Sequence, residues 1–261
     1  MSARATRSLT RGWRPALVLA ALIGIWELYS DLGGVSRRLI LPPPHQVASS
    51  LYDDRSLLWS NFVVTAVEVL LGIVVAAAVA FALAVAIHFS PTLRRALYPL
   101  LVASQTIPIP MIAPLLVLWL GFGILPKLVV IALVAFFPIV VTTLAAFASV
   151  DADLLKLMRT FDASRARTFR LLELPSALPG VLTGAKIAVV VAVIGAVFAE
   201  WAGASKGLGY LFAQSVPQVL TARAYAAVVI LSAFAIVLFA LLTLAERLAV
   251  PWAYRREGEP S

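Results

Sequence analysis

The sequence contains no cysteine and only two histidines, His45 and His88, among its 261 residues. The absence of cysteine excludes disulfides, thiolate metal sites and a cysteine nucleophile. Two distant histidines and scattered carboxylates also lack the ligand spacing of a metal cluster, so we expect no metal. A GxxxxGK[ST] phosphate-binding loop is likewise missing from the sequence, and nucleotide binding of that type is not expected.

Charge is scarce, since 13% of the residues are charged and 62% are hydrophobic. About 20 apolar residues are needed to cross a hydrocarbon layer of roughly 30 Å. Six apolar stretches are candidates, and they lack the alternation of barrel strands, so we expect helices. The stretches are residues 16–32, 62–87, 96–120, 128–148, 178–199 and 225–250. The sequence therefore predicts an all-α membrane protein, a single domain over residues 1–261 with six transmembrane helices.

Lysine and arginine are distributed unevenly between the two sides that six spans would create. One side carries Arg4, Arg7, Arg11, Arg14, Arg94, Arg95, Lys156, Arg159, Arg165, Arg167, Arg170, Arg247, Arg255 and Arg256. The other carries only Arg37, Arg38, Arg55, Lys127, Lys206 and Arg223. Because cytoplasmic flanks carry the basic excess, both termini are predicted to be cytoplasmic. The net charge of +8 is then a topology signal instead of a nucleic-acid-binding face.

Prolines mark two segments. LPPPHQV at residues 41–47 favours extended chain, and residues 47–59 suit a short helix at the membrane interface. The third span contains Pro108, Pro110 and Pro114, each of which removes a backbone donor and bends a helix. Lipid permits this only where neighbouring helices or a cavity satisfy the freed carbonyls. We therefore expect this span inside the bundle beside a pathway, the alternative being a kink with no role in transport.

Ionisable groups occur within the predicted spans, where they are costly and usually face the bundle interior. They are Glu27, Glu68, Lys186 and Glu200. Glu27 and Glu200 lie close enough to the interface to reach the headgroups. Glu68 and Lys186 lie deeper and are the stronger candidates for a translocation pathway, with a structural role as the equal alternative. Glu200 is kept as a third candidate.

Residues 151–175 combine charge, helical periodicity and proline. Leu154, Leu157, Met158 and Phe161 recur at i, i+3, i+4 and i+7, which predicts a helix with one apolar stripe. Asp162 is expected to cap a second short helix by accepting from the amides of Ser164 or Arg165. Pro175 and Pro179 are expected to end that helix.

This segment resembles the EAA loop of ABC importer permeases. Ala163, Ser164, Arg165, Phe169, Leu174 and Pro175 match its form at the expected spacing. LPPP at residues 41–44, IPIPMIAPLLVLWLGFG at 107–123, FFPIVVTT at 136–143 and AEWAGASKGLGYL at 199–211 match as well. Together they resemble the nitrate, sulfonate and taurine subgroup, which includes permeases for pyrimidine precursors of thiamine. The last segment is most similar to that pyrimidine branch.

The resemblance implies a permease in the bacterial inner membrane whose two short cytoplasmic helices, between spans four and five, dock on an ATPase subunit. Phe169 is then expected to enter the ATPase groove, with Arg165, Arg167 and Arg170 around it. Arg159, Asp162, Ala163, Ser164 and Pro175 complete the expected coupling set. The simpler alternative is that the arginines contact lipid headgroups.

The same resemblance implies partners. ATP and Mg²⁺ would be bound by the ATPase dimer, since this chain has no phosphate-binding loop, and an extracytoplasmic binding protein would deliver the solute. Two ATPase grooves and one coupling segment per chain favour a homodimer. The chain departs from the family where Lys156, Leu157 and Met158 replace EAA and Asp162 replaces glycine. Asp tolerates the left-handed conformation better than most residues, so the turn is expected to survive.

Gly203, Ser205 and Gly207 have the GxSxG spacing of a serine hydrolase. An intramembrane serine protease is therefore one rival, but neither histidine lies in the last two spans, and Lys206 is adjacent to Ser205. We instead expect Gly203, Gly207 and Gly209 to let an outer loop pack against the bundle as part of a gate. A passive six-helix channel is the second rival, although a channel does not need the coupling segment.

Overall fold

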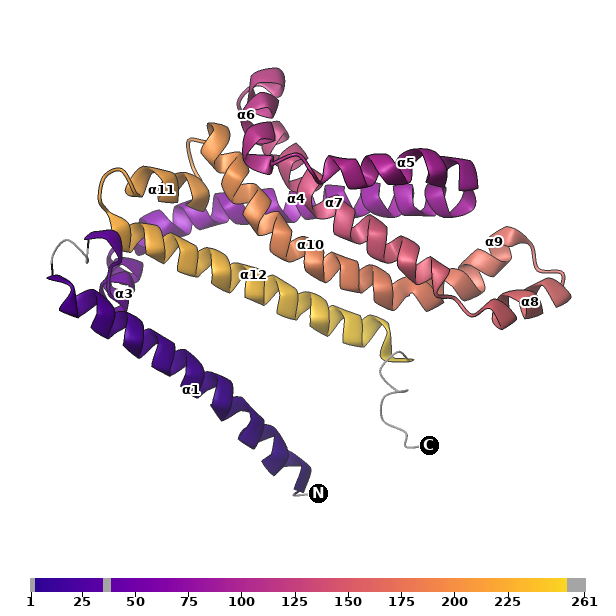
Figure 1. Ribbon diagram of the computed structural model, residues 1–261, viewed down its shortest axis with the longest axis horizontal. Helices are drawn as coiled ribbons and strands as arrows, with labels where there is room; N and C mark the ends of the chain where they lie inside the picture. The colour runs from indigo at the N-terminus through magenta and orange to yellow at the C-terminus, as the bar shows by residue number, and fades with distance from the viewer. Residues whose placement is uncertain (1–2, 35–38, 253–261) are drawn as a thin grey trace. The chain divides into compact units, whose positions relative to one another are not determined.

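The computed structural model describes residues 3–34 and 39–252, with side chains from residue 17 onward (Figure 1). Within these residues the chain forms helices and turns and no strand. The elements are α1 (Ala3–Leu32), α3 (Pro44–Asp53), α4 (Arg55–Phe89), α5 (Pro91–Ser104), α6 (Ile109–Leu120), α7 (Ile124–Ala148), α8 (Ala152–Thr160), α9 (Arg165–Thr168), the π-helical turn η1 (Phe169–Glu173), α10 (Leu174–Gly203), α11 (Leu208–Ser215) and α12 (Thr221–Ala249). The predicted all-α class is confirmed.

Four helical stretches are long and apolar enough to cross a membrane: α4, α7, the continuous run Arg165–Gly203 that includes α10, and α12. They confirm the helices predicted at 62–87, 128–148, 178–199 and 225–250. A fifth span is counted if α5 and α6 are one broken span. The predicted span 16–32 lies within α1, which is not among those counted in the described residues, so six spans stays a prediction.

The orientation of the chain also stays a prediction. Several of the basic residues that carry it, or their side chains, lie outside the described part of the structure. They are Arg4, Arg7, Arg11, Arg14, Arg37, Arg38, Arg255 and Arg256.

The third predicted span is not one helix. Helices α5 and α6 meet at 101° across residues 105–108. Pro108 is extended (φ −64°, ψ 123°), and proline also disfavours the helical conformation of the residue before it. Pro110 falls in the first turn of α6, where the missing N–H has no helical partner to lose. The expected bend is confirmed, but the continuous helix over 96–120 was wrong.

Contacts divide the chain into two compact units, Met1–Asn61 with Leu211–Ile230, and Phe62–Tyr210 with Leu231–Ser261. In the larger unit α7 and α10 run side by side (Figure 1). A Cβ on Gly184 would lie 3.1 Å from Ile139 Cα, and a Cβ on Gly195 would lie 3.1 Å from Val134 Cγ2. Small residues thus let these helices pack closely, as is common in membranes. The single domain expected over residues 1–261 stays a prediction.

The smaller unit is held by polar and aromatic contacts. Arg223 donates two hydrogen bonds to Asp54, at 3.0 and 2.7 Å, and the Trp26 and Tyr225 rings lie 5.8 Å apart. The hydrogen bond from Arg223 lowers the pKa of Asp54 despite partial burial.

The predicted interfacial helix over 47–59 was wrong in its bounds. Helix α3 ends at Asp53, and Arg55 already belongs to α4, because Asp54 leaves the helical conformation (φ −92°, ψ 12°). Pro42 and Pro43 lie outside any helix, as expected, whereas Pro44 begins α3.

Candidate functional site

Helix α8 and helix α9 form a two-helix turn beyond the adjoining ends of α7 and α10 (Figure 1). Asp151 caps α8 by accepting from the N–H of Asp153 at 2.7 Å. Asp162 has φ +53°, which confirms the left-handed turn expected there. Asp162 does not cap α9, however. Ser164 does so by accepting from the N–H of Arg167 at 3.4 Å. Asp162 lies before the N-cap position, in the left-handed turn itself.

The two prolines that follow do not end the helix, contrary to prediction. Helix α9 passes through the π-helical turn η1 into α10 without a break. Leu174 donates its N–H to the carbonyl of Phe169, five residues back, directly before Pro175. A π-turn changes the hydrogen-bond ladder locally, and it is one of the ways in which a helix accommodates an irregularity of this kind. Pro175 lies in the first turn of α10, and Pro179 lies inside it.

The apolar stripe of α8, which continues to Phe161 directly after the helix, is exposed except for the half-buried Met158. Leu154, Leu157 and Phe161 are 45%, 49% and 71% accessible, and no residue of α8 is buried. Monomeric surfaces rarely gather large apolar side chains on one helix without a partner. The structure therefore leaves this stripe available to a second molecule.

Phe169 faces into the chain. Its ring lies 5.1 Å from the Phe89 ring, 5.6 Å from the Phe147 ring and 6.1 Å from the His88 ring. His88 Nε2 in turn lies 2.9 Å from Glu173 Oε2. This aromatic cluster joins α4 and α7 to the π-turn, and the exposed aromatic ring of the segment is that of Phe161.

The arginines of the segment differ in their contacts. Arg165 donates to the carbonyl of Phe89 at 3.2 Å, and its guanidinium lies 5.1 Å from the centre of the Phe89 ring. The side chains of Arg159, Arg167 and Arg170 are exposed, and Ala163 is half-buried. Arg165 therefore connects the turn to the end of α4.

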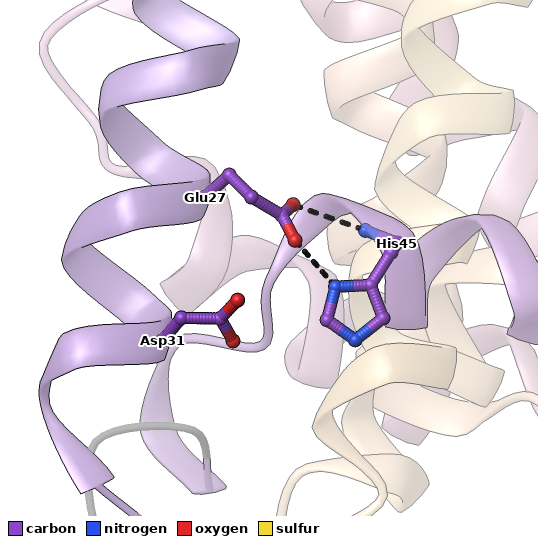
Figure 2. Close-up of side chains that lie close together, drawn as sticks. All are labelled: Glu27, Asp31 and His45. Carbon is purple, nitrogen blue, oxygen red and sulfur yellow. Dashed lines mark hydrogen bonds and ion pairs between the residues drawn. The ribbon is translucent and has the colours of Figure 1, made fainter.

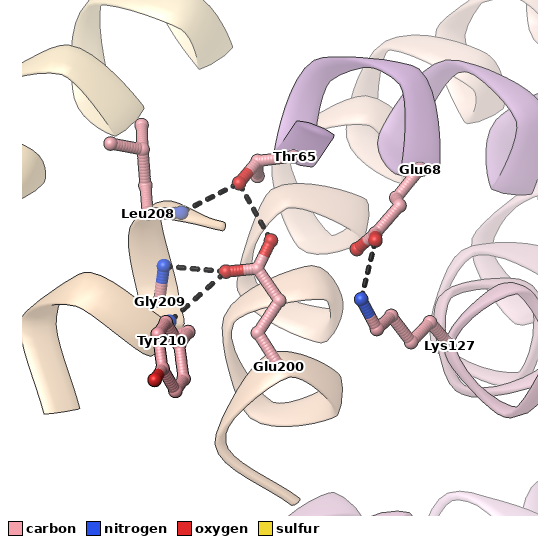
Figure 3. A network of polar contacts seen from close by, with 7 residues as sticks. All are labelled: Thr65, Glu68, Lys127, Glu200, Leu208, Gly209 and Tyr210. Atoms are coloured by element: carbon pink, nitrogen blue, oxygen red, sulfur yellow. Dashed lines mark hydrogen bonds and ion pairs between the residues drawn. The ribbon is translucent and has the colours of Figure 1, made fainter. Parts of the chain in front are cut away.

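At the other ends of α4 and α10, Glu200 is the centre of a buried network (Figure 3). Glu200 is 1% accessible, so the prediction that it reaches the headgroups was wrong. Thr65 donates its hydroxyl to Glu200 Oε1 at 2.6 Å, and the N–H groups of Gly209 and Tyr210 donate to Oε2 at 2.6 and 3.2 Å. Thr65 also accepts from the N–H of Leu208 at 2.8 Å. A carboxylate from α10 thus satisfies the first N–H groups of α11.

The predicted glycines make this approach possible. Gly207 has φ +128°, and a Cβ there would overlap the Glu200 carboxylate. A Cβ on Gly209 would lie 2.8 Å from Val197 Cα, and one on Gly203 would lie 2.8 Å from Val117 Cγ1. The 203–209 loop therefore packs on the bundle as expected, while its role as a gate stays a prediction.

Two further buried ion pairs lie in the larger unit. Lys127 donates to Glu68 at 2.5 Å (Figure 3), and Lys186 donates to Glu246 at 2.6 Å. Lys127 is 8% accessible, although the sequence placed it on the flank of a span. A cavity of about 520 Å³ lies beside Lys127, lined also by Phe122, Gly123, Gly203, Ala204 and Ser205. Glu68 and Lys186 thus each pair with another residue of the chain. Lys127, the partner of Glu68, lines the cavity.

Thr65, Lys127 and Glu246 were missed by the sequence analysis. Thr65 precedes Glu68 by one helical turn, and this spacing of two polar residues in an apolar span was the available signal. The pairing of Lys186 with Glu246 across 60 residues left no such signal.

The family described as "Binding-protein-dependent transport system inner membrane component" matches residues 61–252. The formylaminopyrimidine transport permease protein ThiX of Halalkalibacterium halodurans is 36% identical over 91% of this chain and 95% of its own length. The riboflavin transport system permease protein RibX of Chloroflexus aurantiacus is 34% identical, covering 94% of each chain.

More distant similarities agree with these. An aliphatic sulfonates transport permease protein of Bacillus subtilis, SsuC, is 29% identical over 95% of this chain and 90% of its own. Among solved structures, an amino acid ABC transporter with histidines shares the fold, with a TM-score of 0.60 and 15% identity over 77% of this chain and 96% of that chain.

Proposed function

Because this chain belongs to the binding-protein-dependent transport inner-membrane components, the permease subunits of ABC importers, we propose that it imports a small nitrogen heterocycle of the pyrimidine thiamine-precursor type. The relatives at 36% and 34% identity carry the names of formylaminopyrimidine and riboflavin permeases. Both names denote nitrogen-ring compounds. A sulfonate, taurine or nitrate type of solute is the alternative, supported by the relative at 29% identity.

The observation that carries the transport mechanism is the exposed apolar stripe of α8. Leu154, Leu157 and Phe161 are exposed, and a turn at Asp162, followed by the Ser164 cap of α9, connects α8 to α9. We propose that this stripe enters a groove of the ATPase subunit, with Arg159, Arg167 and Arg170 at the rim. Phe169, which was expected in that groove, is instead proposed to carry the movement onward through Phe89 and Phe147.

The proposed topology has six spans with both termini in the cytoplasm, which places α8 and α9 on the ATPase side. The 203–209 loop then lies on the opposite side, where an extracytoplasmic binding protein delivers the solute. The Glu200 network is proposed to hold this loop as an outer gate. A homodimer would present two α8 stripes to two ATPase subunits, which bind the ATP and Mg²⁺.

The pathway is proposed to pass the cavity beside Lys127 and the broken helix at Pro108 and Pro110. A broken helix in a membrane requires neighbouring groups or a water-filled space to satisfy its backbone. This arrangement favours the Glu68–Lys127 pair over Lys186 as the charged group nearest the solute.

Coupled uptake into vesicles tests the mechanism. The complete importer, reconstituted with its ATPase and binding protein, is compared with two variants of this chain, Phe161→Asp and the matched control Ala152→Asp. Ala152 is an exposed α8 residue off the apolar stripe. We expect Phe161→Asp to abolish ATP-dependent uptake and Ala152→Asp to retain it. Equal uptake in both variants would contradict docking through the stripe, and uptake without ATP would favour a channel.

The solute is tested separately with the binding protein of the same importer. Calorimetry with a hydroxymethyl- or formylaminopyrimidine, riboflavin, taurine and nitrate gives the order of affinity. We expect the pyrimidine to bind most tightly. Preference for taurine or nitrate would refute the proposed solute class without affecting the permease assignment.

A further inference from the structure

Three potential metal ligands meet where α1 lies against the start of α3 (Figure 2). One ligand atom from each of Glu27, Asp31 and His45 lies within 4.8 Å of the other two. All three residues belong to the smaller unit, which contains none of the residues proposed for coupling or for the pathway. We propose that they form a binding site for a divalent transition-metal ion, with Zn²⁺ as its typical occupant.

The ligands are positioned by their own elements. Glu27 and Asp31 are four residues apart on α1 and therefore share one face of that helix. His45 follows a run of three prolines, whose rings fix the backbone before it. Its N–H donates to Glu27 Oε2 at 3.3 Å, and its Nδ1 contacts Glu27 Oε1. The imidazole is thus directed at the carboxylates before any cation binds.

Electrostatics favours a cation at this place. Two carboxylates at this separation repel each other. A divalent ion between the three side chains removes the repulsion and uses all of them.

The donor set selects the kind of ion. One imidazole nitrogen and two carboxylate oxygens suit Zn²⁺ and its first-row neighbours, whereas Ca²⁺ and Mg²⁺ prefer oxygen alone. Three protein ligands leave a fourth position open to water or another ligand. Tetrahedral zinc at about 2.1 Å from its ligands separates them by about 3.4 Å. A bound ion would therefore part the short Glu27–His45 contact and draw the more distant ligand atoms together.

The ligand side chains are exposed enough for an ion to reach them. The side chains of His45 and Glu27 are 57% and 32% accessible, so an ion can enter from solvent without unfolding the unit. Binding exchanges the Glu27–His45 contact for two metal bonds and displaces a proton where one is present. A bound ion would tie α1 to α3 across the segment between them.

The full chain, purified in detergent and freed of metal with a chelator, is titrated with ZnCl₂ by calorimetry. We expect one Zn²⁺ per chain and at least tenfold weaker binding in Glu27→Gln, Asp31→Asn and His45→Gln. Asp53→Asn, which removes an exposed carboxylate at the other end of α3, is the control and should bind as the wild type does. CoCl₂ gives a second readout, since low-coordinate Co²⁺ with a protein nitrogen ligand absorbs visible light far more strongly than the hydrated ion.

Several results would overturn the proposal. They are the absence of Zn²⁺ binding by the wild-type chain, equal affinity in all variants, or loss of binding in His45→Gln alone, which would indicate a single adventitious imidazole contact. If a variant unfolds, the wild-type Co²⁺ spectrum still decides, because a spectrum like that of the hydrated ion contradicts the site.

Discussion

Glu200 is the residue on which the 203–209 loop depends, since its carboxylate accepts from Thr65, Gly209 and Tyr210. A hydrogen bond to a charged group contributes about 1.5–3 kcal/mol, and a buried N–H left without an acceptor costs a similar amount. In Glu200→Gln one acceptor oxygen becomes a donor that faces N–H or O–H groups. We expect the free energy of unfolding of Glu200→Gln to fall by about 3 kcal/mol, which lowers the unfolding temperature. We also expect a thiol introduced by Ser205→Cys to be labelled faster in the Glu200→Gln background.

The control for this prediction is Trp201→Phe, which changes the neighbouring, half-exposed residue. It should alter neither the unfolding temperature nor the labelling rate. Wild-type stability and labelling in Glu200→Gln would show that the network does not hold the loop.

Lys186 and Glu246 form a second test at the residue scale. Their side chains are 16% and 6% accessible, and removing one partner leaves a buried charge that costs about 3–5 kcal/mol. We expect Lys186→Met to lower stability and uptake, and the double variant Lys186→Met with Glu246→Met to recover both. Recovery of stability without uptake would instead place Lys186 on the solute's route.

At the scale of elements, the turn between α8 and α9 depends on a left-handed residue. Asp162 has φ +53°, a conformation that costs most side chains about 1–2 kcal/mol and glycine almost nothing. Asp162→Gly should therefore keep full coupling between ATP hydrolysis and uptake in reconstituted vesicles. Asp162→Val should lose most of it, because a β-branched residue there displaces α8. Similar coupling in both variants would mean that the turn geometry is unimportant.

The stability contributed by the ion pair between Asp54, directly after α3, and Arg223 of α12 depends on pH. Arg223 lowers the pKa of the Asp54 carboxyl below its ordinary value of 3.8. The ion pair therefore stabilises the fold above that value, and its contribution is lost as the pH falls through the lowered pKa. Partly exposed pairs contribute about 1 kcal/mol.

Unfolding temperatures of the purified chain measure this contribution. Between pH 7 and pH 5 Asp54→Asn should unfold below the wild type by a constant difference, and that difference should shrink once the pH falls below about 3.8. An equal difference at every pH would assign the effect to packing instead of charge.

The elements themselves were largely predictable. Runs of about 20 apolar residues have only one stable form in lipid, so the helices at 62–87, 128–148, 178–199 and 225–250 followed from composition. The continuation of the helix through Pro175 could not be predicted in this way. It depends on the π-turn at Phe169–Glu173, whose local hydrogen bonding the proline does not reveal. Phe169 was assigned to the partner surface from the resemblance, since the sequence does not tell which face of a short helix meets its own chain.

At the scale of the whole molecule, the motifs between residues 41 and 211 predicted the family, and the family match over residues 61–252 confirms that prediction. The partners of the buried charges could not be predicted, since Glu68 and Lys127 are 59 residues apart and Lys186 and Glu246 are 60 apart. Such pairs depend on the packing of whole helices against one another. Individual buried charges were recognised, but not their partners.

We propose that α8 transmits the force of a separate ATPase to this permease. A photo-crosslinking phenylalanine analogue at position 161 of the assembled importer tests it most directly, with the same analogue at position 152 as the control. We expect a covalent adduct with the ATPase subunit from position 161 and little from position 152. An ATP-hydrolysing importer that gives no ATPase adduct from position 161 would contradict it.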